Sequence, residues 1–496
     1  MTLLERSTCK ITALNSIGFG VGVSDNSSTI VEVPYTIPQE VIEFEKHSYR
    51  NKSSFVLSKI LKTSDHRVVP PCKYFAICGG CSLQHLKLDY YLQYKLDTLS
   101  QLLAKHDIET FINTIKSIGA ASRRRAIFEA VKKHDQLFLG FKKFQSDKIV
   151  NIDSCLVLLP ELSELIDKLK FILFEILENK EKCKIIVTKA DNGIVLTLEM
   201  KNNRQDSEII NTGSLRSQWI AQDDGTLKNF CQENDIIKLT IIDDAKWHVL
   251  HLAQQPYIAF EDIKVAIESD SFLQVSSASD RILAEILNDV FKKLDPRISR
   301  GNDAIAKLQI VDLFCGRGTL TIPATKFGAV DGFESEKASV KALREALKRH
   351  AELTNRQQQA HNRHPEERSD VKTQSLLGLN NKKRLDPYVG LRPPLDDGCI
   401  NIYQRDLFTT PLSWSELNKY DIAIINPPRA GAKEQAASLA TSTVKTIIYL
   451  SCNPETFARD AKIILREGRY ILEEITPIDQ FYWSHHLEVM GVFKLA

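Results

Sequence analysis

The chain has 496 residues, which is long enough for two to four domains and more than one hydrophobic core. Its 65 basic and 63 acidic residues nearly cancel, so any surface that attracts nucleic acid must be local. The first residues contain no apolar core of signal-peptide length, and no run of about 18 apolar residues occurs, so we expect neither a secretion leader nor a membrane span. Ten cysteines without a secretion signal indicate a reducing cytoplasm, where clustered cysteines bind metals or act in catalysis more often than they form disulfides.

Residues 8–65 are expected to form a small all-β domain. Short alternating runs at 29–33, 41–44 and 54–61 are separated by glycine, asparagine and proline. Gly18, Gly20 and Gly22 suit a tight corner between two strands.

A cysteine-rich stretch follows, with the sequence CKYFAICGGCSLQHL at 72–86. It contains Cys72, Cys78 and Cys81, and Cys155 follows farther along the chain. Zinc sites normally use paired C-x2-C hooks, and only one such pair is present. A compact triplet with one distant cysteine favours a four-iron cluster, although unrelated reduced cysteines are the alternative.

Two local basic stretches, SRRRA (122–126) and GFKKFQSDK (140–148), are candidate RNA contacts. Basic side chains hold phosphates, and the phenylalanines of the second stretch can stack on unpaired bases. A solvated charged face is the alternative interpretation for each. Residues 156–265 mix a helical pattern at 162–177 with apolar strands, so we expect 66–268 to form a central α+β domain.

The remainder, 269–496, is expected to be a doubly wound α/β domain. Apolar strands predicted at 310–314, 329–333, 400–403, 422–425 and 446–450 alternate with helices. The polar stretch 354–398 interrupts this alternation within a helix, and we expect it to be a disordered surface insertion without a part in the chemistry.

The segment VDLFCGRGTLTIPA (311–324) predicts a strand, a glycine turn and a helix. Gly316 and Gly318 let the backbone approach a ligand, and Glu334 at the end of the next strand can accept hydrogen bonds from ribose hydroxyls. There is no Gly-Lys-Ser/Thr and no third glycine, which disfavours a phosphate ligand. S-adenosylmethionine, with ribose and adenine but no phosphate, fits better; a plain turn with incidental glycines is the alternative.

Two later strands are predicted to end at the same edge of the sheet, where open α/β sheets bind ligands. DIAIINPPRAGA (421–432) ends rigidly in Asn426-Pro427-Pro428-Arg429, which can hold a planar substrate. YLSCNPETFARD (449–460) places Cys452 at the end of the next strand. A thiolate there can attack an electron-poor carbon such as C6 of a pyrimidine, and a buried structural cysteine is the alternative.

Together, LFCGRGT, NPPRAG, YLSCNP and the closing DQFYWSHHLE resemble the bacterial RNA uridine-5-methyltransferases. The similarity is greatest to the branch with an N-terminal TRAM barrel, an iron–sulfur cluster and a 23S ribosomal RNA substrate. It implies a Rossmann-like class I methyltransferase domain preceded by a small TRAM-like β-barrel and a central α+β domain. It also implies a 4Fe-4S cluster held by Cys72, Cys78, Cys81 and Cys155. We expect a cytoplasmic monomer.

The same resemblance assigns residue roles. It implies that Cys452 adds to C6 of uracil, and that Glu488 is the base that removes the C5 proton. FLQVSS (272–277) resembles the family's FxQxN, with Ser276 in place of the usual Asn. The implied cofactor contacts are Gln274, Phe314, Gly316, Gly318, Thr319, Glu334, Asp406 and Asn426. The implied substrate contacts are Pro427, Arg429, Arg123, Arg124 and Arg125.

The chain also departs from the family's pattern. Asn426 replaces the usual Asp, and Tyr482-Trp483 stand where the family tends to have proline and a small polar residue. Asn-Pro-Pro is also typical of exocyclic-amine methyltransferases, although these need no cysteine. Two alternatives therefore stay open: the same chemistry on transfer RNA, and a catalytically weakened RNA-binding or assembly protein.

Overall fold

The computed structural model describes residues 6–49, 52–201, 225–243, 245–269, 271–294, 308–362 and 400–496. Its N-terminal sheet is antiparallel, in the order β3-β2-β1-β4-β5. Alternate residues of these strands, such as Cys9 and Ile11 on β1, point into a small core of their own. The strands are β1 (Arg6–Leu14), β2 (Gly20–Ser24), β3 (Ile30–Val33), β4 (Val41–Tyr49) and β5 (Lys52–Lys62).

A central sheet has seven strands in the order β10-β9-β8-β11-β12-β13-β14, of which only β12 and β13 pair in parallel. Apolar residues at helical spacing on α2 (Pro160–Ile176) pack on its core. The strands are β8 (Arg125–Lys133), β9 (Gln136–Lys142), β10 (Ile149–Asn151), β11 (Lys182–Ala190), β12 (Gly193–Lys201), β13 (Ile236–Asp243) and β14 (Lys246–Leu252). The hairpin β15 (Tyr257–Phe260) and β16 (Ile263–Ala266) follows α4 (Thr226–Glu233) and this sheet in the chain.

The C-terminal sheet confirms the predicted α/β fold. Its strand order is β19-β18-β17-β20-β21-β23-β22-β6, with β7 pairing to β22. The first five run in parallel, and β23 is antiparallel to both of its neighbours. The strands are β17 (Leu308–Leu313), β18 (Gly328–Glu334), β19 (Ile400–Gln404), β20 (Ile422–Ile425), β21 (Thr446–Ser451), β22 (Tyr470–Asp479) and β23 (Glu488–Leu495). The helices are α5 (Ser277–Leu294), α6 (Thr321–Ala324), α7 (Lys337–Asn362), α8 (Trp414–Leu417), α9 (Lys433–Ala440) and α10 (Pro454–Leu465).

The strand order reverses between β17 and β20, which is the topological switch point where open α/β sheets bind ligands. The carboxyl ends of β17, β18, β20 and β21 carry the glycine turn, Glu334, the Asn-Pro-Pro-Arg segment and Cys452. Parallel pairing thus brings four segments that are distant in sequence to one edge of the sheet.

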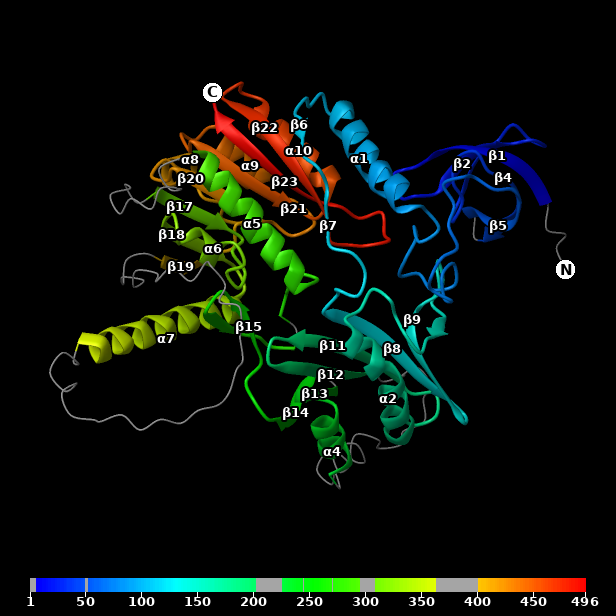
Figure 1. Ribbon diagram of the computed structural model, residues 1–496, viewed down its shortest axis with the longest axis horizontal. Helices are drawn as coiled ribbons and strands as arrows, with labels where there is room; N and C mark the ends of the chain where they lie inside the picture. Colours follow the sequence, from blue (N-terminus) through cyan, green and yellow to red (C-terminus); the bar gives the residue numbers. More distant parts are fainter. Residues whose placement is uncertain are drawn as a thin grey trace, which may run out of the picture.

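Residues 88–117 lie differently from the sequence expectation, which placed them in the central domain. Helix α1 (Leu88–Lys105) lies beside α10, and β6 (Phe111–Ile112) and β7 (Lys116–Ser117) pair in parallel with β22 (Figure 1). Leu99 and Leu103 of α1 share one core with Tyr449 and Phe457. The second half of the C-terminal sheet is therefore completed by an early part of the chain.

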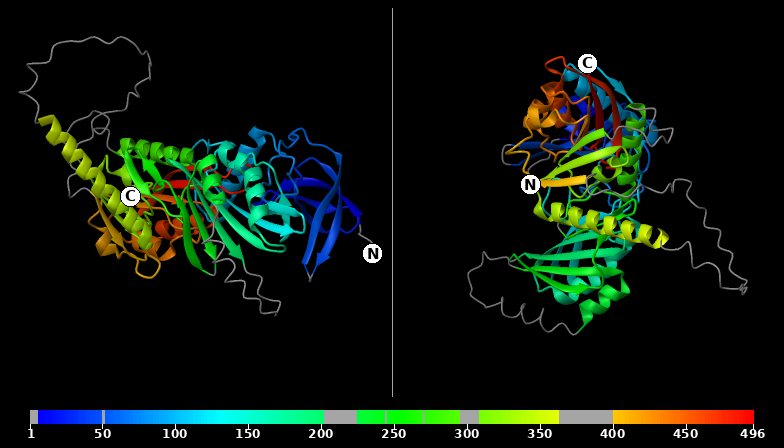
Figure 2. Two further views of the ribbon diagram at one scale, coloured as in Figure 1. Left: turned by 90° about the horizontal axis from the view of Figure 1, so that it is seen from below. Right: turned by 90° about the vertical axis from the view of Figure 1, so that its left-hand side faces the viewer.

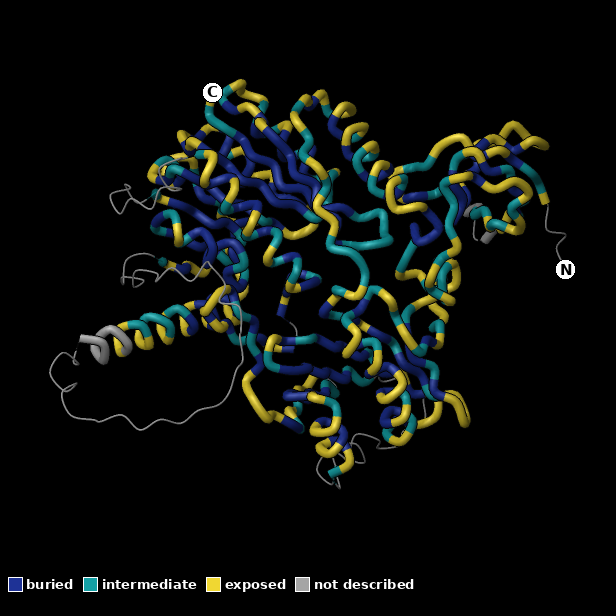
Figure 3. The backbone as a smooth tube through the Cα atoms, viewed as in Figure 1, coloured by how far each residue is buried: buried dark blue, intermediate teal, exposed yellow. Residues whose placement is uncertain are grey.

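The N-terminal sheet lies at one end of the long axis, and the C-terminal sheet with α7 lies toward the other end (Figure 2). The strands of the C-terminal sheet are buried, whereas much of α7 is exposed (Figure 3). This helix runs to Asn362, past the expected start of the insertion at 354; the rest of the expected insertion, 363–398, lies outside the described residues. No helix in the described part of the chain is long and apolar enough to cross a membrane.

Candidate active site

A cavity of about 500 Å³ opens at the switch point. Its walls come from segments that are distant in the sequence. They include the chain before α5, the glycine turn, the end of β18, the loop after β20, the turn after β21 and the 480–488 segment. Most of the predicted cofactor-binding and catalytic residues, and two of the predicted substrate contacts, meet there: Gln274, Phe314, Gly316, Thr319, Glu334, Asn426, Pro427, Arg429, Cys452 and Glu488.

The two predicted glycines have different roles. Gly316 has a φ of +54°, and a Cβ on it would meet no atom within 4 Å, so its backbone is open to the cavity. Gly318 does not line the cavity, and its Cβ would lie 2.9 Å from Cδ1 of Leu343 on α7. Gly318 is therefore needed for helix packing rather than for contact with a ligand.

Glu334 braces the glycine turn. Its Oε2 accepts a hydrogen bond from the Gly316 backbone N–H at 3.0 Å, and its Oε1 accepts one from the Glu336 N–H at 2.8 Å. Oε1 also accepts a hydrogen bond from the Ser335 hydroxyl at 3.1 Å, so Oε2 is the oxygen that keeps a lone pair for a ligand hydroxyl.

Asp406 is not in the cavity, contrary to the expectation from the family pattern. The residue is exposed, and its Oδ1 accepts a hydrogen bond from the Phe408 N–H at 2.9 Å within a turn. Phe408 reaches the cavity instead, with its ring centroid 5.3 Å from that of Phe314. A large apolar side chain in an exposed turn was the available signal for this residue.

Gln274 lines the cavity from a segment that Arg124 holds in place. Arg124 is 3% exposed; its Nε donates to the Gln274 carbonyl at 3.0 Å, and its guanidinium also bonds Asp280 at 2.6 Å. Arg124 thus supports the cavity wall, and the expected RNA contact through this side chain is not supported. Ser276, which replaces the usual Asn, accepts a hydrogen bond from the Ser279 N–H at the start of α5.

The other basic and aromatic candidates also lie largely inside the fold. Arg125 donates to the carbonyls of Ser271 and Ser269, whereas Arg123 is exposed at the rim of the cysteine pocket. Phe144 packs edge-on against Phe19 and Tyr35, with ring centroids 5.8 and 5.5 Å away. Phe141 packs against Phe128 at 5.0 Å. The Phe144 ring therefore joins the first two sheets, and the Phe141 ring packs within the central sheet, rather than presenting a base-stacking surface.

Cys452 lies in the turn between β21 and α10, as the sequence predicts. Asn453 caps α10 by accepting a hydrogen bond from the Glu455 N–H at 3.2 Å, and Pro454 occupies the first turn. Burial raises the pKa of the half-buried Cys452 thiol, the Glu488 carboxylate raises it further, and the Arg429 guanidinium opposes both. The positive end of α10 also favours a thiolate.

Helix α10 and its cap residue hold the loop that carries Arg429. Asp460 is fully buried and accepts hydrogen bonds from the Ala432 N–H at 2.7 Å and the Tyr449 hydroxyl at 2.6 Å. The Arg429 carbonyl accepts one from the Asn453 side chain at 3.3 Å. The backbone is thus held while the exposed Arg429 side chain stays beside Cys452.

Glu488 is the first residue of β23 and is 2% exposed. Burial raises its pKa to about 8, and the charge of Asp280 adds to the shift. Its Oε2 has no hydrogen-bond partner among the described residues. A buried carboxyl with a free oxygen, lining the same cavity as a thiol, is suited to moving a proton.

Cys452 and Arg429 also line a second cavity of about 400 Å³. This side cavity lies between α1, the turn after β1 and the 485–487 segment; it is lined by Asn15, Tyr94, Lys95, His485 and His486, among others. Cys452 therefore stands between a cavity at the glycine turn and one that faces the N-terminal sheet.

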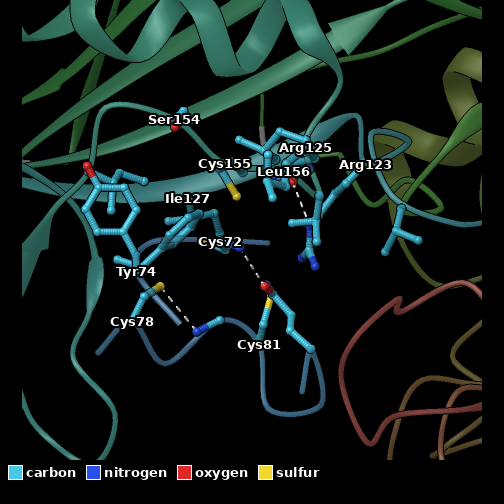
Figure 4. Close-up of a pocket in the computed structure, with 18 of the residues that line it drawn as sticks. Cys72, Tyr74, Cys78, Cys81, Arg123, Arg125, Ile127, Ser154, Cys155 and Leu156 are labelled. Atoms are coloured by element: carbon cyan, nitrogen blue, oxygen red, sulfur yellow. Dashed lines mark hydrogen bonds between the residues drawn. The ribbon is translucent and has the colours of Figure 1, made fainter. Parts of the chain in front are cut away.

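The four predicted metal-binding cysteines line one further pocket of about 610 Å³. In Figure 4 the sulfur atoms of Cys78, Cys81 and Cys155 turn toward the same space. Burial raises the pKa of Cys81 to about 12, and the neighbouring cysteines add to the shift. As placed, no three His, Cys, Asp or Glu side chains of the described ranges are close enough to hold a metal ion. The thiol donor set nevertheless fits an iron–sulfur cluster in type and number.

An open, mostly parallel sheet with a glycine turn and a cavity at its switch point defines an α/β enzyme of the Rossmann-like class, which includes the S-adenosylmethionine-dependent methyltransferases. Comparison with known proteins narrows this class. The family model described as tRNA (uracil-5-)-methyltransferase matches residues 408–495. The chain is 30% identical, over 99% of its length and 96% of the relative's, to the protein of Shewanella halifaxensis named 23S rRNA (uracil(1939)-C(5))-methyltransferase RlmD. An uncharacterized RNA methyltransferase of Brucella suis is 29% identical over 97% of this chain and 96% of its own.

A solved structure has the same overall fold. It is that of the Pyrococcus abyssi tRNA (uracil-54, C5)-methyltransferase in complex with S-adenosyl-L-homocysteine, with a TM-score of 0.62 and 20% identity, covering 98% of this chain and 99% of that one. The protein belongs to the RNA uracil-C5 methyltransferase family, which confirms the enzyme class predicted from the sequence.

Proposed function

We propose that the protein transfers the methyl group of S-adenosylmethionine to C5 of a uridine in 23S ribosomal RNA. The observation that carries the proposal is the meeting of Cys452 and the buried Glu488 in one cavity with the glycine turn. The name of the Shewanella relative supports ribosomal RNA as the substrate.

The two residues divide the reaction between them. The Cys452 thiolate adds to C6 of uracil, and the electron pair of the C5=C6 bond moves into the enolate. C5 then takes the methyl group, and the sulfonium leaves as a neutral sulfide. Glu488 removes the C5 proton, the electrons of that C–H bond restore C5=C6, and the C6–S bond breaks to return the thiolate.

The cavity divides into a cofactor side and a substrate side. We assign the cofactor to the side of Gly316, where Glu334 can accept from ribose hydroxyls and Phe314 and Phe408 can contact the adenine ring. Arg429 and Cys452, which border both cavities, lie on the substrate side. Bound there, S-adenosylmethionine supplies an electrophilic methyl group.

We further propose that Cys72, Cys78, Cys81 and Cys155 hold a 4Fe-4S cluster. Their common pocket is the support for this assignment. The reaction above needs no electron transfer, so we expect the cluster to have a structural or RNA-positioning role. The N-terminal sheet, which we propose to be a TRAM-like barrel, borders the side cavity through Asn15 and would contact the RNA beside the target base.

The direct test traps the covalent intermediate. Ribosomal RNA that contains 5-fluorouridine is mixed with S-adenosylmethionine and either wild-type protein or Cys452→Ala. Fluorine cannot be removed as a proton, so a working enzyme stalls as a protein–RNA adduct that resists denaturation. We expect an adduct with wild type and none with Cys452→Ala, and mapping it names the uridine.

Two other results would change the assignment. An adduct that forms with transfer RNA but not with ribosomal RNA would keep the chemistry and replace the substrate. No adduct with either RNA, from protein that still binds RNA, would favour an RNA-binding protein without catalysis. Asn426, on the cavity wall, would then be the first residue to change to Asp.

A further inference from the structure

The segment that leads to the catalytic base, residues 479–487, is held by the N-terminal half of the chain. Lys95 on α1 is 1% exposed; its Nζ donates to Asp479 Oδ1 at 2.5 Å and to the His486 carbonyl at 2.7 Å. The Lys95 ammonium group therefore links Asp479, at the start of this segment, to His486, which lies two residues before Glu488.

Tyr91, one helical turn before Lys95, supports the same segment. Its hydroxyl donates to Asp479 Oδ2 at 2.8 Å and accepts the Trp483 N–H at 3.0 Å. The Ser117 hydroxyl adds a bond of 3.2 Å to Asp479. The Asp479 carboxylate is thus fully buried and bonded by three side chains from residues 91–117.

The cysteine-rich loop holds the middle of the segment. The backbone N–H groups of Ser82 and Leu83 donate to the Trp483 carbonyl at 2.9 and 3.0 Å. Trp483 has a φ of +61°, a left-handed conformation that a tryptophan seldom adopts without outside support. Its N–H and its carbonyl are both fixed by residues 82–91.

Burying a lysine and an aspartate is expensive, and a well-packed apolar pair is often at least as stable. Buried ionic networks are best attested where they fix one arrangement among several. Here the bonded atoms belong to an irregular segment that ends at Glu488 and forms a wall of both cavities. The hydrogen bonds from Lys95 and Tyr91 therefore hold the segment in one position, which regular secondary structure does not do here.

We propose that Lys95 and Tyr91 are positioning residues that hold the 479–487 segment so that the Glu488 carboxylate reaches the C5 proton. The proposal rests on the proposed function. Attack by Cys452 and methyl transfer use the turn after β21 and the glycine turn, whereas the last step needs Glu488. Loss of the positioning should therefore slow proton removal and release of the thiolate more than the two steps before them.

This separation gives a specific signature. With ordinary uridine RNA, Lys95→Met and Tyr91→Phe should accumulate a covalent protein–RNA adduct that already carries the new methyl group. Steady-state turnover should fall about 10- to 100-fold, which is less than the roughly 100- to 10,000-fold contribution of a general base because Glu488 is misplaced rather than removed. The first turnover, followed by transfer of radioactive methyl into RNA, should change little. Lys95→Arg, which keeps the charge and two donors, should recover part of the turnover.

The controls distinguish the positioning role of Lys95 and Tyr91 from the proposed function on which it rests. Glu488→Gln should accumulate the same adduct, and Lys87→Met, at an exposed position beside the start of α1, should behave as wild type. Tyr91→Phe removes one hydroxyl only, so it tests the proposal even if Lys95→Met does not fold. Folding of each variant is checked by adduct formation with 5-fluorouridine RNA.

Two outcomes would overturn the inference. If the 5-fluorouridine adduct falls in proportion to turnover in both variants, Lys95 and Tyr91 support the fold in general rather than the base. If turnover is unchanged in both variants, the segment needs neither residue. Absence of the 5-fluorouridine adduct from wild type would instead reject the proposed function itself, and with it the role of Glu488 as base.

Discussion

The Glu488 carboxyl is buried beside the Cys452 thiol, and its negative charge raises the pKa of that thiol. Two acidic groups that must each lose a proton during the reaction therefore oppose one another's ionisation. Only Arg429, among the groups that shift the thiol's pKa, favours the thiolate through its charge.

The first prediction concerns pH. Glu488 acts in its ionised form and has a pKa of about 8, so turnover should rise as pH increases through about 8; because the pKa of the Cys452 thiol is also raised, the rise should continue at higher pH. Measurement of kcat between pH 6 and 10 in saturating RNA checks this. A turnover that falls across this range would contradict the assignment of Glu488 as base.

The second prediction is that Glu488→Gln stabilises the protein in alkaline solution. The folded-state pKa of Glu488 lies above the ordinary value of 4.5, so its protonation stabilises the fold at low pH and this contribution is lost as pH rises from 4.5 toward 8. Glu488→Gln should raise the free energy of unfolding by about 1–3 kcal/mol at pH 8 and by little at pH 4.5. Denaturant titrations at both pH values measure it, and an equal change at both would contradict it.

The third prediction separates the two glycines of the turn. Gly318→Ala places a Cβ 2.9 Å from Leu343 at a φ of +93° and should lower the free energy of unfolding by about 1–3 kcal/mol. Gly316→Ala meets open space and should cost about 1 kcal/mol of strain. Its larger effect should be weaker binding of S-adenosylmethionine, measured by calorimetry. Equal losses of stability would argue against the different roles of the two positions.

The fourth prediction compares adjacent arginines. Arg124→Met leaves Asp280 without its buried partner and should lower the free energy of unfolding by about 3–5 kcal/mol. Arg123→Met removes an exposed side chain and should leave stability nearly unchanged. If Arg123 contacts a phosphate, this variant binds RNA more weakly and with a salt dependence smaller by about one ion. An unchanged salt dependence would remove Arg123 from the RNA interface.

The fifth prediction tests the cysteine pocket. Cys155→Ser should lose iron and the brown colour of anaerobic preparations, because Cys155 lines the pocket with Cys72, Cys78 and Cys81. Cys183→Ala, in the core of the central sheet, should keep both and serves as the matched control. Full iron content in Cys155→Ser would exclude this thiol as a ligand.

The sequence predicted most of the site because its signals are local. Cys452 and Gly316 follow apolar strands and Glu334 ends one, and parallel strands bring their carboxyl ends together whatever lies between them. The glycines and the proline-rich turn needed no distant partner to be recognised.

What the sequence did not predict depends on distant partners. Arg124 is buried because Gln274 and Asp280, far along the chain, complete its hydrogen bonds. The pairing of β6 with β22 joins residues more than 300 positions apart, and a two-residue strand has no periodicity to detect. Asp406 was placed by analogy in the cavity, whereas its turn presents Phe408.

The position of α1 also determines the order in which the chain can fold during synthesis. A ribosome produces Leu88–Lys105 and β6 long before β22 and β23, so these elements leave the exit tunnel without the sheet edge on which they finally lie. A fragment cut at the 268/269 border would carry Asp479 without the lysine that neutralises it and an unpaired edge on β22. Packing of α1 against the strands that are synthesised last, β22 and β23, thus completes both the fold and the wall of the active-site cavities.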